Sequence, residues 1–388
     1  MFESLLPPLA VVSLLIWISL ALLRGGFWRV RLPGECAAPL RWPAVAAVVP
    51  ARDEADVLEG ALTSLLQQDY PGEFHIFLVD DHSSDGTADV ARATAAKLNL
   101  NNRLTVVAAR DLPAGWAGKV WAQSEGLLAQ HTALPHARYV FLTDADIGHG
   151  RRTVRELVAR AEAEQRVLTS LMVRLRCSSF AEKALVPAFV YFFAKLYPFA
   201  RVNNPHSKVA AAAGGCMLAR VDALNRIGGI AAIKDALIDD CALGAQMKRQ
   251  GSIRLDLAQD SHSLRPYNDW RSIWNMIARS AYTQLRHSVW LLAGTVLAML
   301  LTYVAPPVLT VLWLAGHGQG LWPALSAWLI MSLLYLPMLR YYGRSPLWTL
   351  ALPLIALFYL AATLGSAWRY WLGRGGQWKG RNQAPTHH

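Results

Sequence analysis

Four long apolar stretches constrain this chain more than any other feature of its sequence. They are residues 5–23, 289–316, 321–339 and 346–368, and none of them contains a charged side chain. Each is long enough to cross the roughly 30 Å hydrocarbon core of a bilayer as a helix. The block between the first and second stretches has the composition of a soluble domain. The sequence therefore predicts a membrane-anchored protein with one large domain outside the bilayer.

The charges around the first stretch predict its orientation. A cleaved signal peptide would begin with basic residues, whereas only Glu3 precedes this stretch and Arg24, Arg29 and Arg31 follow it. The bias of basic residues towards the cytoplasm then places the N-terminus outside and residues 24–288 inside. Basic residues near the C-terminus also favour the cytoplasm, but three crossings would leave that end outside. Either one C-terminal stretch is re-entrant, or the bias is overridden there.

Net charge indicates the kind of partner, and cysteine content indicates the state of the thiols. The formal charge of +11 fits an anionic membrane surface and a diphosphate-bearing substrate. The basic residues are dispersed and no recognition motif accompanies them, which argues against nucleic acid as a partner. Cys36, Cys177, Cys216 and Cys241 form no Cys-x-x-Cys pair, so reduced thiols without metal ligation are expected.

Apolar runs alternate with helical patterns in the first half of the soluble block. The predicted strands are 45–49, 74–79, 104–108 and 139–142, and the predicted helices between them are 55–67, 87–98 and 120–130. Such alternation implies right-handed crossovers and a mostly parallel sheet covered on both faces, which is an α/β fold. Ligands bind such sheets beyond the carboxyl ends of the strands.

Acidic pairs follow two of these predicted strands. Asp80-Asp81 ends one strand and Asp144-Ala145-Asp146 ends another, so the two pairs can meet in one crevice. Asp-x-Asp alone most often marks a surface turn, but its place after an apolar strand favours a site. Carboxylate oxygens suit Mg²⁺ or Mn²⁺, which keep substrate phosphates in their shell. Asp144 and Asp146 are therefore the candidate metal ligands, and Asp81 is a candidate nucleotide contact.

A third acidic pair, Asp239-Asp240, opens a predicted helix. One acid is explained as a favourable charge at a helix N-terminus. The second, Asp240, is predicted to be the general base that takes the proton from an acceptor hydroxyl. Lys119 follows a glycine turn and either neutralises a diphosphate or is a solvated surface lysine. Gly214-Gly215 either lets the backbone approach a ligand closely or forms a turn.

Two groups of polar residues are interpreted as structural. Asp85 lies in a turn-and-cap sequence, Ser83 to Thr87, that opens a helix, and capping explains it. Four histidines lack the spacing of metal ligands and are interpreted as ordinary polar residues. They are His82, His149, His262 and His287.

Two later segments are typical of membrane-surface elements. Residues 184–194 are apolar, lie between two lysines and are too short to cross, which leaves a core helix or an interfacial one. An apolar stripe with basic flanks precedes the second long stretch, and it favours a helix in the headgroup plane over an ordinary core-facing helix. The stripe comprises Trp270, Ile273, Trp274, Ile277, Ala281, Tyr282 and Leu285.

Several strings of residues resemble those of a known family. Residues 49–54, 79–87, 118–119, 143–146 and 238–243 are similar to glycosyltransferase family 2, whose members have the GT-A fold. A narrower resemblance, to the hopanoid-biosynthesis-associated glycosyltransferases, extends over nearly the whole chain, anchors included. It rests on residues 115–122, 186–193, 196–199, 213–218 and 281–285.

The resemblance implies an inverting, metal-dependent enzyme of the bacterial inner membrane, with its catalytic domain in the cytoplasm. The implied donor is a nucleotide sugar, a UDP-sugar first, and the implied ion is Mg²⁺ or Mn²⁺. Asp240 would be the catalytic base, and Asp144 and Asp146 would lie at the ribose, diphosphate and metal. The other residues expected to bind substrate are Ala51, Arg52, Glu54, Asp81, Lys119, Gly214, Gly215 and Asp239.

One departure from the family pattern bears on the reaction. Processive members carry Gln-x-x-Arg-Trp, whereas this chain reads Gln284-Leu-Arg-His-Ser288, with Arg286 out of step and no tryptophan. A single transfer to a membrane lipid is therefore expected instead of polymerisation, with a hopanoid as the candidate acceptor. Kinship of fold fixes neither the acceptor nor the sugar.

The expected domain organisation follows from these assignments. It comprises an anchor (1–24), a GT-A domain (40–265), an amphipathic interfacial helix (266–288), a membrane region of about three segments (289–370) and a basic tail (371–388). Two other function classes compete with the enzyme. A lipid-binding or scaffolding protein with an inactive site would not hydrolyse UDP-sugars with Mn²⁺. A sugar nucleotidyltransferase would carry a glycine-rich phosphate loop, which residues 45–54 lack.

Overall fold

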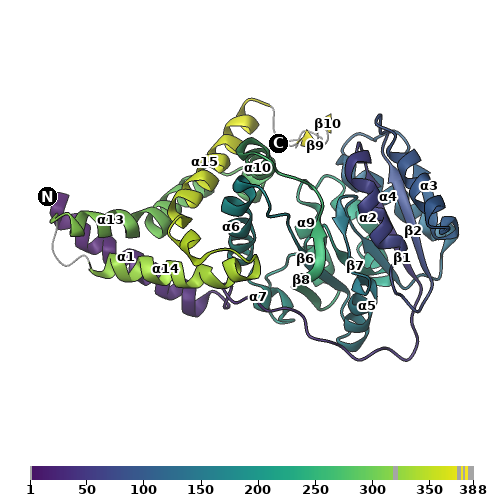
Figure 1. Ribbon diagram of the computed structural model, residues 1–388, viewed down its shortest axis with the longest axis horizontal. Coiled ribbons are helices and arrows are strands. Elements are labelled where there is room, and N and C mark those ends of the chain that lie inside the picture. The colour runs from purple at the N-terminus through teal and green to yellow at the C-terminus, as the bar shows by residue number, and fades with distance from the viewer. Residues whose placement is uncertain (1, 318–321, 374–376, 379–380, 383–388) are drawn as a thin grey trace. The chain divides into compact units, whose positions relative to one another are not determined.

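The computed structural model describes residues 2–317, 322–373, 377–378 and 381–382. The chain divides into two compact units (Figure 1). Unit 1 comprises residues 1–30, 177–200 and 267–375, and unit 2 comprises residues 31–176, 201–266 and 376–388. Most of the predicted basic tail lies outside the described residues, which here include residues 371–373 and the two-residue strands β9 (Gln377–Trp378) and β10 (Arg381–Asn382).

Unit 2 is built on one eight-stranded sheet with the order β3-β2-β1-β4-β7-β6-β8-β5. Its strands are β1 (Val45–Ala51), β2 (Phe74–Asp80), β3 (Leu104–Ala108), β4 (Tyr139–Leu142), β5 (Ile147–Gly148), β6 (Leu168–Arg174), β7 (Met217–Arg220) and β8 (Ile253–Ser263). The pairings among β1 to β4 are all parallel, as the alternation of strands and helices predicts.

The other half of the sheet is mixed. β7 runs antiparallel to both β4 and β6, and β5 runs antiparallel to β8, whereas β6 and β8 are parallel. The sheet is therefore less uniformly parallel than expected. Helices still lie between the strands beyond β4, but β7 pairs antiparallel with both β4 and β6, so alternation alone does not set the strand directions there.

The helices of unit 2 cover both faces of the parallel half. Three of them match the predicted helices within a few residues at either end. They are α2 (Ala55–Leu66), α3 (Thr87–Lys97) and α4 (Gly118–Ala133), which lie alongside the strands in Figure 1. The others are α5 (Thr153–Ala163), α8 (Val221–Arg226), α9 (Asp239–Lys248) and the 3₁₀ turns η1 (Asn101–Arg103) and η2 (Gly229–Ile233), and α7 (Phe199–Asn203) lies where the chain passes between units.

The core of unit 2 explains why these strands are so apolar. All seven residues of β1 are buried, since the strand lies in the interior of the sheet with helices over it. Alternate residues, Val45 and Val49 among them, pack with the apolar side of α2. On the opposite face α4 approaches so closely that a Cβ at Gly126 would clash with Val48.

Unit 1 is helical. Its elements are α1 (Phe2–Leu23), α6 (Phe180–Leu196), α10 (Trp270–Ala278), α11 (Ala281–Gln284), α12 (Val289–Met299), the π-helical turn η3 (Leu300–Val304), α13 (Ala305–Leu314), α14 (Trp322–Tyr341), η4 (Pro346–Thr349) and α15 (Leu352–Trp371). Four helical segments are long and apolar enough to cross a membrane, and they coincide with the four predicted stretches. They are Leu5–Leu23, Val289–Leu314, Trp322–Tyr341 and Leu352–Trp371.

The two predicted membrane-surface segments both pack inside unit 1. Most of α6 is buried, which fits the core-helix alternative for residues 184–194. In α10, Ile273 and Ile277 are buried, and the Trp274 ring lies against Phe358 and Gly365 of α15. Trp270 is 44% exposed. Much of the stripe is thus engaged within the protein, and a position of the helix in the headgroup plane stays a prediction.

Candidate active site

The sheet topology brings the predicted site residues to one edge of unit 2. β2, β1 and β4 are parallel neighbours, so their carboxyl ends lie together. β7 runs the other way, and its first residue, Met217, pairs with Leu142 at the end of β4. Gly214-Gly215, just before β7, therefore reaches the same edge as Asp144-Ala145-Asp146. The acidic pair that opens α9 joins them, as the contacts below establish.

Lys119 lies at the centre of the acidic cluster. It is the second residue of α4, and its Nζ lies 2.7 Å from Asp144 Oδ1 and 3.2 Å from Asp239 Oδ2. Burial opposes the charge on Lys119, but Asp144 and Asp239 outweigh it and raise the pKa of Lys119 above its usual range. The alternative of a solvated surface lysine is therefore wrong. Lys119 is the counter-charge that lets two carboxylates approach each other.

Asp240 is held differently from its neighbours. Its Oδ2 accepts a hydrogen bond of 2.9 Å from the Gly214 amide, and its Oδ1 accepts one of 2.7 Å from the Cys241 amide. Burial and the adjacent charge of Asp239 raise the pKa of Asp240 to about 6. A carboxylate with this pKa is ionised at neutral pH yet can take up a proton, which is what a general base requires.

The two glycines leave room in different places, Gly214 beside the acidic cluster and Gly215 in the core. A Cβ at Gly214 would lie 3.2 Å from Lys119 Nζ and 3.5 Å from Asp240 Oδ2. Gly214 thus borders the cluster, and its close approach to a ligand stays a prediction. A Cβ at Gly215 would instead lie 3.2 Å from Val173 and 3.3 Å from Ile147. Close packing against the core accounts for Gly215.

Arg265 joins two predicted site residues and was not itself predicted. Its Nε donates to Asp146 Oδ2 at 2.6 Å, and its Nη2 donates to both carboxylate oxygens of Glu54 at 2.7 and 2.5 Å. It reaches them because β8 pairs with β5 and the Leu264 amide bonds the Asp146 carbonyl. Burial and the charge of Asp144 raise the pKa of Asp146, against the pull of Arg265. An isolated arginine after a strand carries no local signal of this role.

The residues expected at the nucleotide line the ends of β1 and β2. The Asp81 amide donates to the Ala51 carbonyl at 2.9 Å, and Arg52 Nη1 donates to the Asp81 carbonyl at 2.6 Å. Arg52 Nη1 also lies 3.6 Å from Asp81 Oδ2. Asp85 accepts from the amides of Ala55 and Thr87 at 2.9 and 3.0 Å. Asp85 therefore ties the two turns together, which confirms its structural interpretation.

The carboxylates at this edge fit a divalent ion that takes some of its ligands from the protein and the others from a substrate. Among the described residues, no three or more His, Cys, Asp or Glu side chains are grouped to hold a metal by themselves. Mg²⁺ is commonly held by one or two carboxylates together with phosphate and water oxygens. Asp144 and Asp146 supply such carboxylates, each already beside a cation, Lys119 and Arg265.

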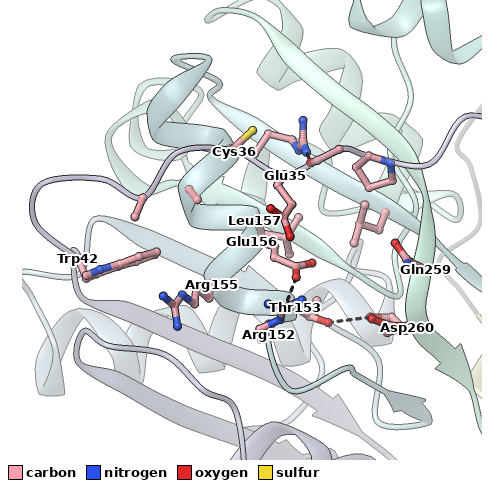
Figure 2. A pocket seen from close by; sticks show the side chains of 17 residues that line it. Glu35, Cys36, Trp42, Arg152, Thr153, Arg155, Glu156, Leu157, Gln259 and Asp260 are labelled. Atoms are coloured by element: carbon pink, nitrogen blue, oxygen red, sulfur yellow. Dashed lines mark hydrogen bonds and ion pairs between the residues drawn. The ribbon is translucent and has the colours of Figure 1, made fainter.

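A separate cavity lies elsewhere in unit 2 (Figure 2). Its volume is about 370 Å³, and it is lined by the segment 33–42, by α5 and by the end of β8. Figure 2 shows Arg152 and Glu156 forming an ion pair in its wall. None of the predicted catalytic, donor-binding or metal residues lines it, so this cavity is not the candidate active site.

A model of glycosyl transferase family 21 matches residues 11–382, which is nearly the whole chain. The chain belongs to glycosyl transferase family 21. The match includes the acidic cluster and the apolar helices of unit 1. The predicted glycosyltransferase class is thereby confirmed, whereas membership of family 2 and the association with hopanoids stay predictions. A comparison with curated proteins found no match.

A likeness to one solved structure supports the fold. The mannosyltransferase PcManGT from Pyrobaculum calidifontis, in complex with GDP-Man and Mn²⁺, is 22% identical, with a TM-score of 0.54 over 94% of this chain and 99% of that one. S. aureus TarS 1–349 with UDP-GlcNAc is 12% identical, with a TM-score of 0.41 over 87% and 95% of the two chains. M. tuberculosis glucosyl-3-phosphoglycerate synthase is 19% identical, with a TM-score of 0.36 over 61% and 78%. The first agrees with the predicted GT-A class.

Proposed function

We propose that this family 21 glycosyltransferase transfers one sugar from a nucleotide-sugar donor to the hydroxyl of a membrane lipid, with inversion at the anomeric carbon. The observation that carries the proposal is the placement of Asp240. It is a partly buried carboxylate whose pKa is raised to about 6, beside the cluster of Lys119, Asp144 and Asp239. Family membership supplies the reaction class.

Asp240 acts as the base in this proposal. The acceptor oxygen forms a bond to the anomeric carbon while the bond from that carbon to the diphosphate oxygen breaks. The hydroxyl proton passes to the Asp240 carboxylate, and the nucleoside diphosphate leaves with the electron pair. Attack from the side opposite the leaving group inverts the configuration. The amides of Gly214 and Cys241 hold the carboxylate in place for this transfer.

Lys119 and the residues at the ends of β1 and β2 bind the donor in this proposal. The Lys119 side chain is only 17% exposed and pairs with two carboxylates, so a diphosphate that arrives nearby finds a cation already held in place. Ala51, Arg52 and Glu54 lie next to the nucleobase of the donor, and Asp81 contacts the nucleotide. The GDP-Man in the PcManGT structure supports a nucleotide-sugar donor. A UDP-sugar is our first candidate, and GDP-mannose is the second.

Asp144 and Asp146 would hold Mg²⁺ or Mn²⁺. A bound ion of this kind supplies positive charge that offsets the charge of the diphosphate. The Mn²⁺ in the PcManGT structure supports this assignment. Asp239 is not a candidate metal ligand and lies 3.2 Å from Lys119.

The acceptor and the location follow from the apolar helices. We propose a multi-pass protein of the bacterial inner membrane, with residues 40–265 as a cytoplasmic catalytic domain between the anchor 1–24 and the membrane region 289–370. Residues 266–288 lie at the interface, and the basic tail 371–388 follows. The four long apolar helices support membrane residence. The strings shared with hopanoid-associated family 2 enzymes make a hopanoid our candidate acceptor.

The purified full chain tests this proposal. We expect it to release nucleotide from UDP-glucose, UDP-GlcNAc or GDP-mannose in the presence of Mn²⁺ and a hopanoid-containing lipid extract. Mass spectrometry should then find the extract glycosylated by wild type and untouched by Asp240→Asn. Lipid binding without nucleotide release from any donor would favour the scaffolding alternative. Conversion of the donor and added pyrophosphate into a nucleoside triphosphate and a sugar 1-phosphate would favour a nucleotidyltransferase.

A further inference from the structure

Unit 2 contains a buried polar chain that the proposed reaction does not use. It consists of Thr153, Ser261, His149 and Thr143, which are 5, 1, 6 and 1% exposed. Thr153 Oγ1 lies 3.2 Å from Ser261 Oγ, and Ser261 Oγ lies 3.1 Å from His149 Nδ1. His149 Nε2 lies 2.8 Å from Thr143 Oγ1, which in turn donates to the Gly215 carbonyl at 2.8 Å. Side chains from three separate segments thus form one continuous path.

The protons of this path can run in one direction only. The Thr143 hydroxyl lies 2.8 Å from the Gly215 carbonyl and 3.5 Å from the Asp144 carbonyl, and it donates its single proton to the nearer one. Thr143 Oγ1 must then accept from His149, whose Nε2 carries the hydrogen. Burial lowers the pKa of His149 to about 3, so the ring is neutral and its Nδ1 carries no hydrogen. Nδ1 accepts from Ser261, and Ser261 accepts from Thr153.

The path ends on the loop that holds Asp240. Ser170 accepts from the Ala213 amide at 2.9 Å and donates to the Ala213 carbonyl at 3.2 Å. Thr143 holds the Gly215 carbonyl on the other side of Gly214. Between these two buried hydroxyls lies the Gly214 amide, which donates to Asp240 Oδ2 at 2.9 Å. The position of that amide is therefore fixed from both sides by side chains that lie outside the acidic cluster.

We propose that Thr143, oriented by His149, is a positioning residue for Asp240. Its hydroxyl holds the Gly215 carbonyl and thereby keeps the Gly214 amide on the carboxylate that acts as base. The inference rests on the proposed role of Asp240. Sequence spacing indicated only an ordinary polar residue at His149. The inference gives it a defined tautomer and the role of orienting Thr143.

Substitution of the hydroxyl separates this role from simple packing. Thr143→Val keeps the volume but leaves the Gly215 carbonyl and the His149 Nε2–H without partners in a buried place. The loop can then shift, and the Asp240 carboxylate shifts with it. Thr143→Ser loses a methyl group but keeps the hydroxyl. Thr132 offers a matched control, since it is an exposed threonine on α4 whose hydroxyl bonds only within its own helix.

Steady-state kinetics with the full chain provide the first test, on whichever of UDP-glucose, UDP-GlcNAc and GDP-mannose the wild type uses. Because small displacements of a catalytic group are costly, we expect Thr143→Val to lower kcat by about ten- to a hundredfold. The donor KM should stay within about threefold, since the donor contacts remain. Thr143→Ser and Thr132→Val should resemble wild type. Equal kcat for Thr143→Val and wild type would overturn the inference.

The tautomer of His149 provides a test that needs no activity. In ¹⁵N-histidine-labelled full chain, with His149→Gln to assign the resonance, we expect a neutral ring protonated at Nε2 from about pH 5 to pH 8. A ring protonated at Nδ1, or at both nitrogens, would overturn the direction of the path. If Thr143→Val does not fold, this measurement still decides that point.

The two proposals fail separately. If Asp240→Asn transfers sugar as fast as wild type, the proposed base is wrong and the positioning role falls with it. If Asp240→Asn is inactive while Thr143→Val is fully active, only the positioning role is wrong. Thermal unfolding of each variant distinguishes a lost contact from a lost fold.

Discussion

Asp240 differs from the other acids of the cluster in what its oxygens contact. Asp144 and Asp239 pair with Lys119, and Asp146 pairs with Arg265. Both oxygens of Asp240 instead accept hydrogen bonds from backbone amides. Its pKa therefore reflects burial and the nearby charge of Asp239 more than a cation of its own. At the scale of single residues, this contrast separates a base from groups that bind charge.

The raised pKa of Asp240 predicts the pH at which activity is lost on the acidic side (the acidic limb) of the pH–rate profile. Because the base must be ionised, kcat should fall as the pH drops through about 6. Lys119 opposes the shift, whereas the charge of Asp239 adds to it. Asp239→Asn should therefore move the limb to lower pH. A pH–rate profile with saturating donor checks both statements, and a limb that stays in place in Asp239→Asn would contradict the assigned cause.

The proposed metal site makes a prediction for Asp146. Asp146→Asn should weaken Mn²⁺-dependent binding of the nucleoside diphosphate, since one of the two carboxylates that would hold the ion is lost. Calorimetry with UDP or GDP and Mn²⁺ measures this, with Asp69→Asn as a control because Asp69 forms an exposed ion pair with Arg155. An affinity like that of wild type would place the ion elsewhere.

At the scale of elements, local pattern predicted the parallel half of unit 2 and missed the rest. β3 and β4 have the predicted bounds, and α4 begins two residues earlier than expected, which places Lys119 in its first turn. Uniform burial of β1 explains this success, because interior strands read as continuous apolar runs. The antiparallel half depends on pairings such as that of β5 with β8, which no local pattern encodes.

The same limit applies to the site. Acids that follow strands directly were predictable from the sequence because strand ends share one edge of a parallel sheet. Arg265 was not, since its partners Glu54 and Asp146 lie far away in the sequence and meet it only through the β5–β8 pairing. The partners of Lys119 could likewise not be predicted from the sequence, because α9 brings Asp239 to it through tertiary packing.

Arg265 should stabilise the connection between these elements. Arg265→Met leaves Glu54 and Asp146 as neighbouring buried carboxylates without their cation, which should lower the free energy of unfolding by about 3 kcal/mol. Chemical unfolding of the full chain in detergent measures the loss. Lys97→Met, which removes an exposed ion pair with Glu59, is the matched control and should leave the midpoint unchanged. Equal midpoints for both variants would show that Arg265 does not hold the elements together.

At the scale of the whole molecule, charge is divided unevenly between the units. Unit 1 carries eleven lysines and arginines against three acids, Glu3, Glu182 and Asp269, so its formal charge of +8 accounts for most of the +11 of the chain. Glu182 caps α6 and also accepts from the Tyr267 amide, so its charge is used within the fold. Basic residues without acidic neighbours fit a unit that faces anionic lipid.

Trp270 tests the interfacial placement of α10. Trp270→Glu puts a carboxylate in place of a ring that is 44% exposed, so we expect the protein to stay in the membrane fraction and to hydrolyse donor. Transfer to lipid should fall if the helix lies in the headgroup plane. Trp274→Glu is the contrasting variant, since Trp274 packs on Gly365 and its replacement should destabilise unit 1. Unchanged lipid transfer by Trp270→Glu would favour an ordinary packed helix.

The lipids of living cells test the central claim most directly. Lipid extracts would be compared by mass spectrometry between a strain that lacks this gene and the same strain carrying either wild type or Asp240→Asn. We expect a glycosylated lipid, a hopanoid first, that is present with wild type and absent from both other strains. A lipid profile that is the same in all three strains would contradict it.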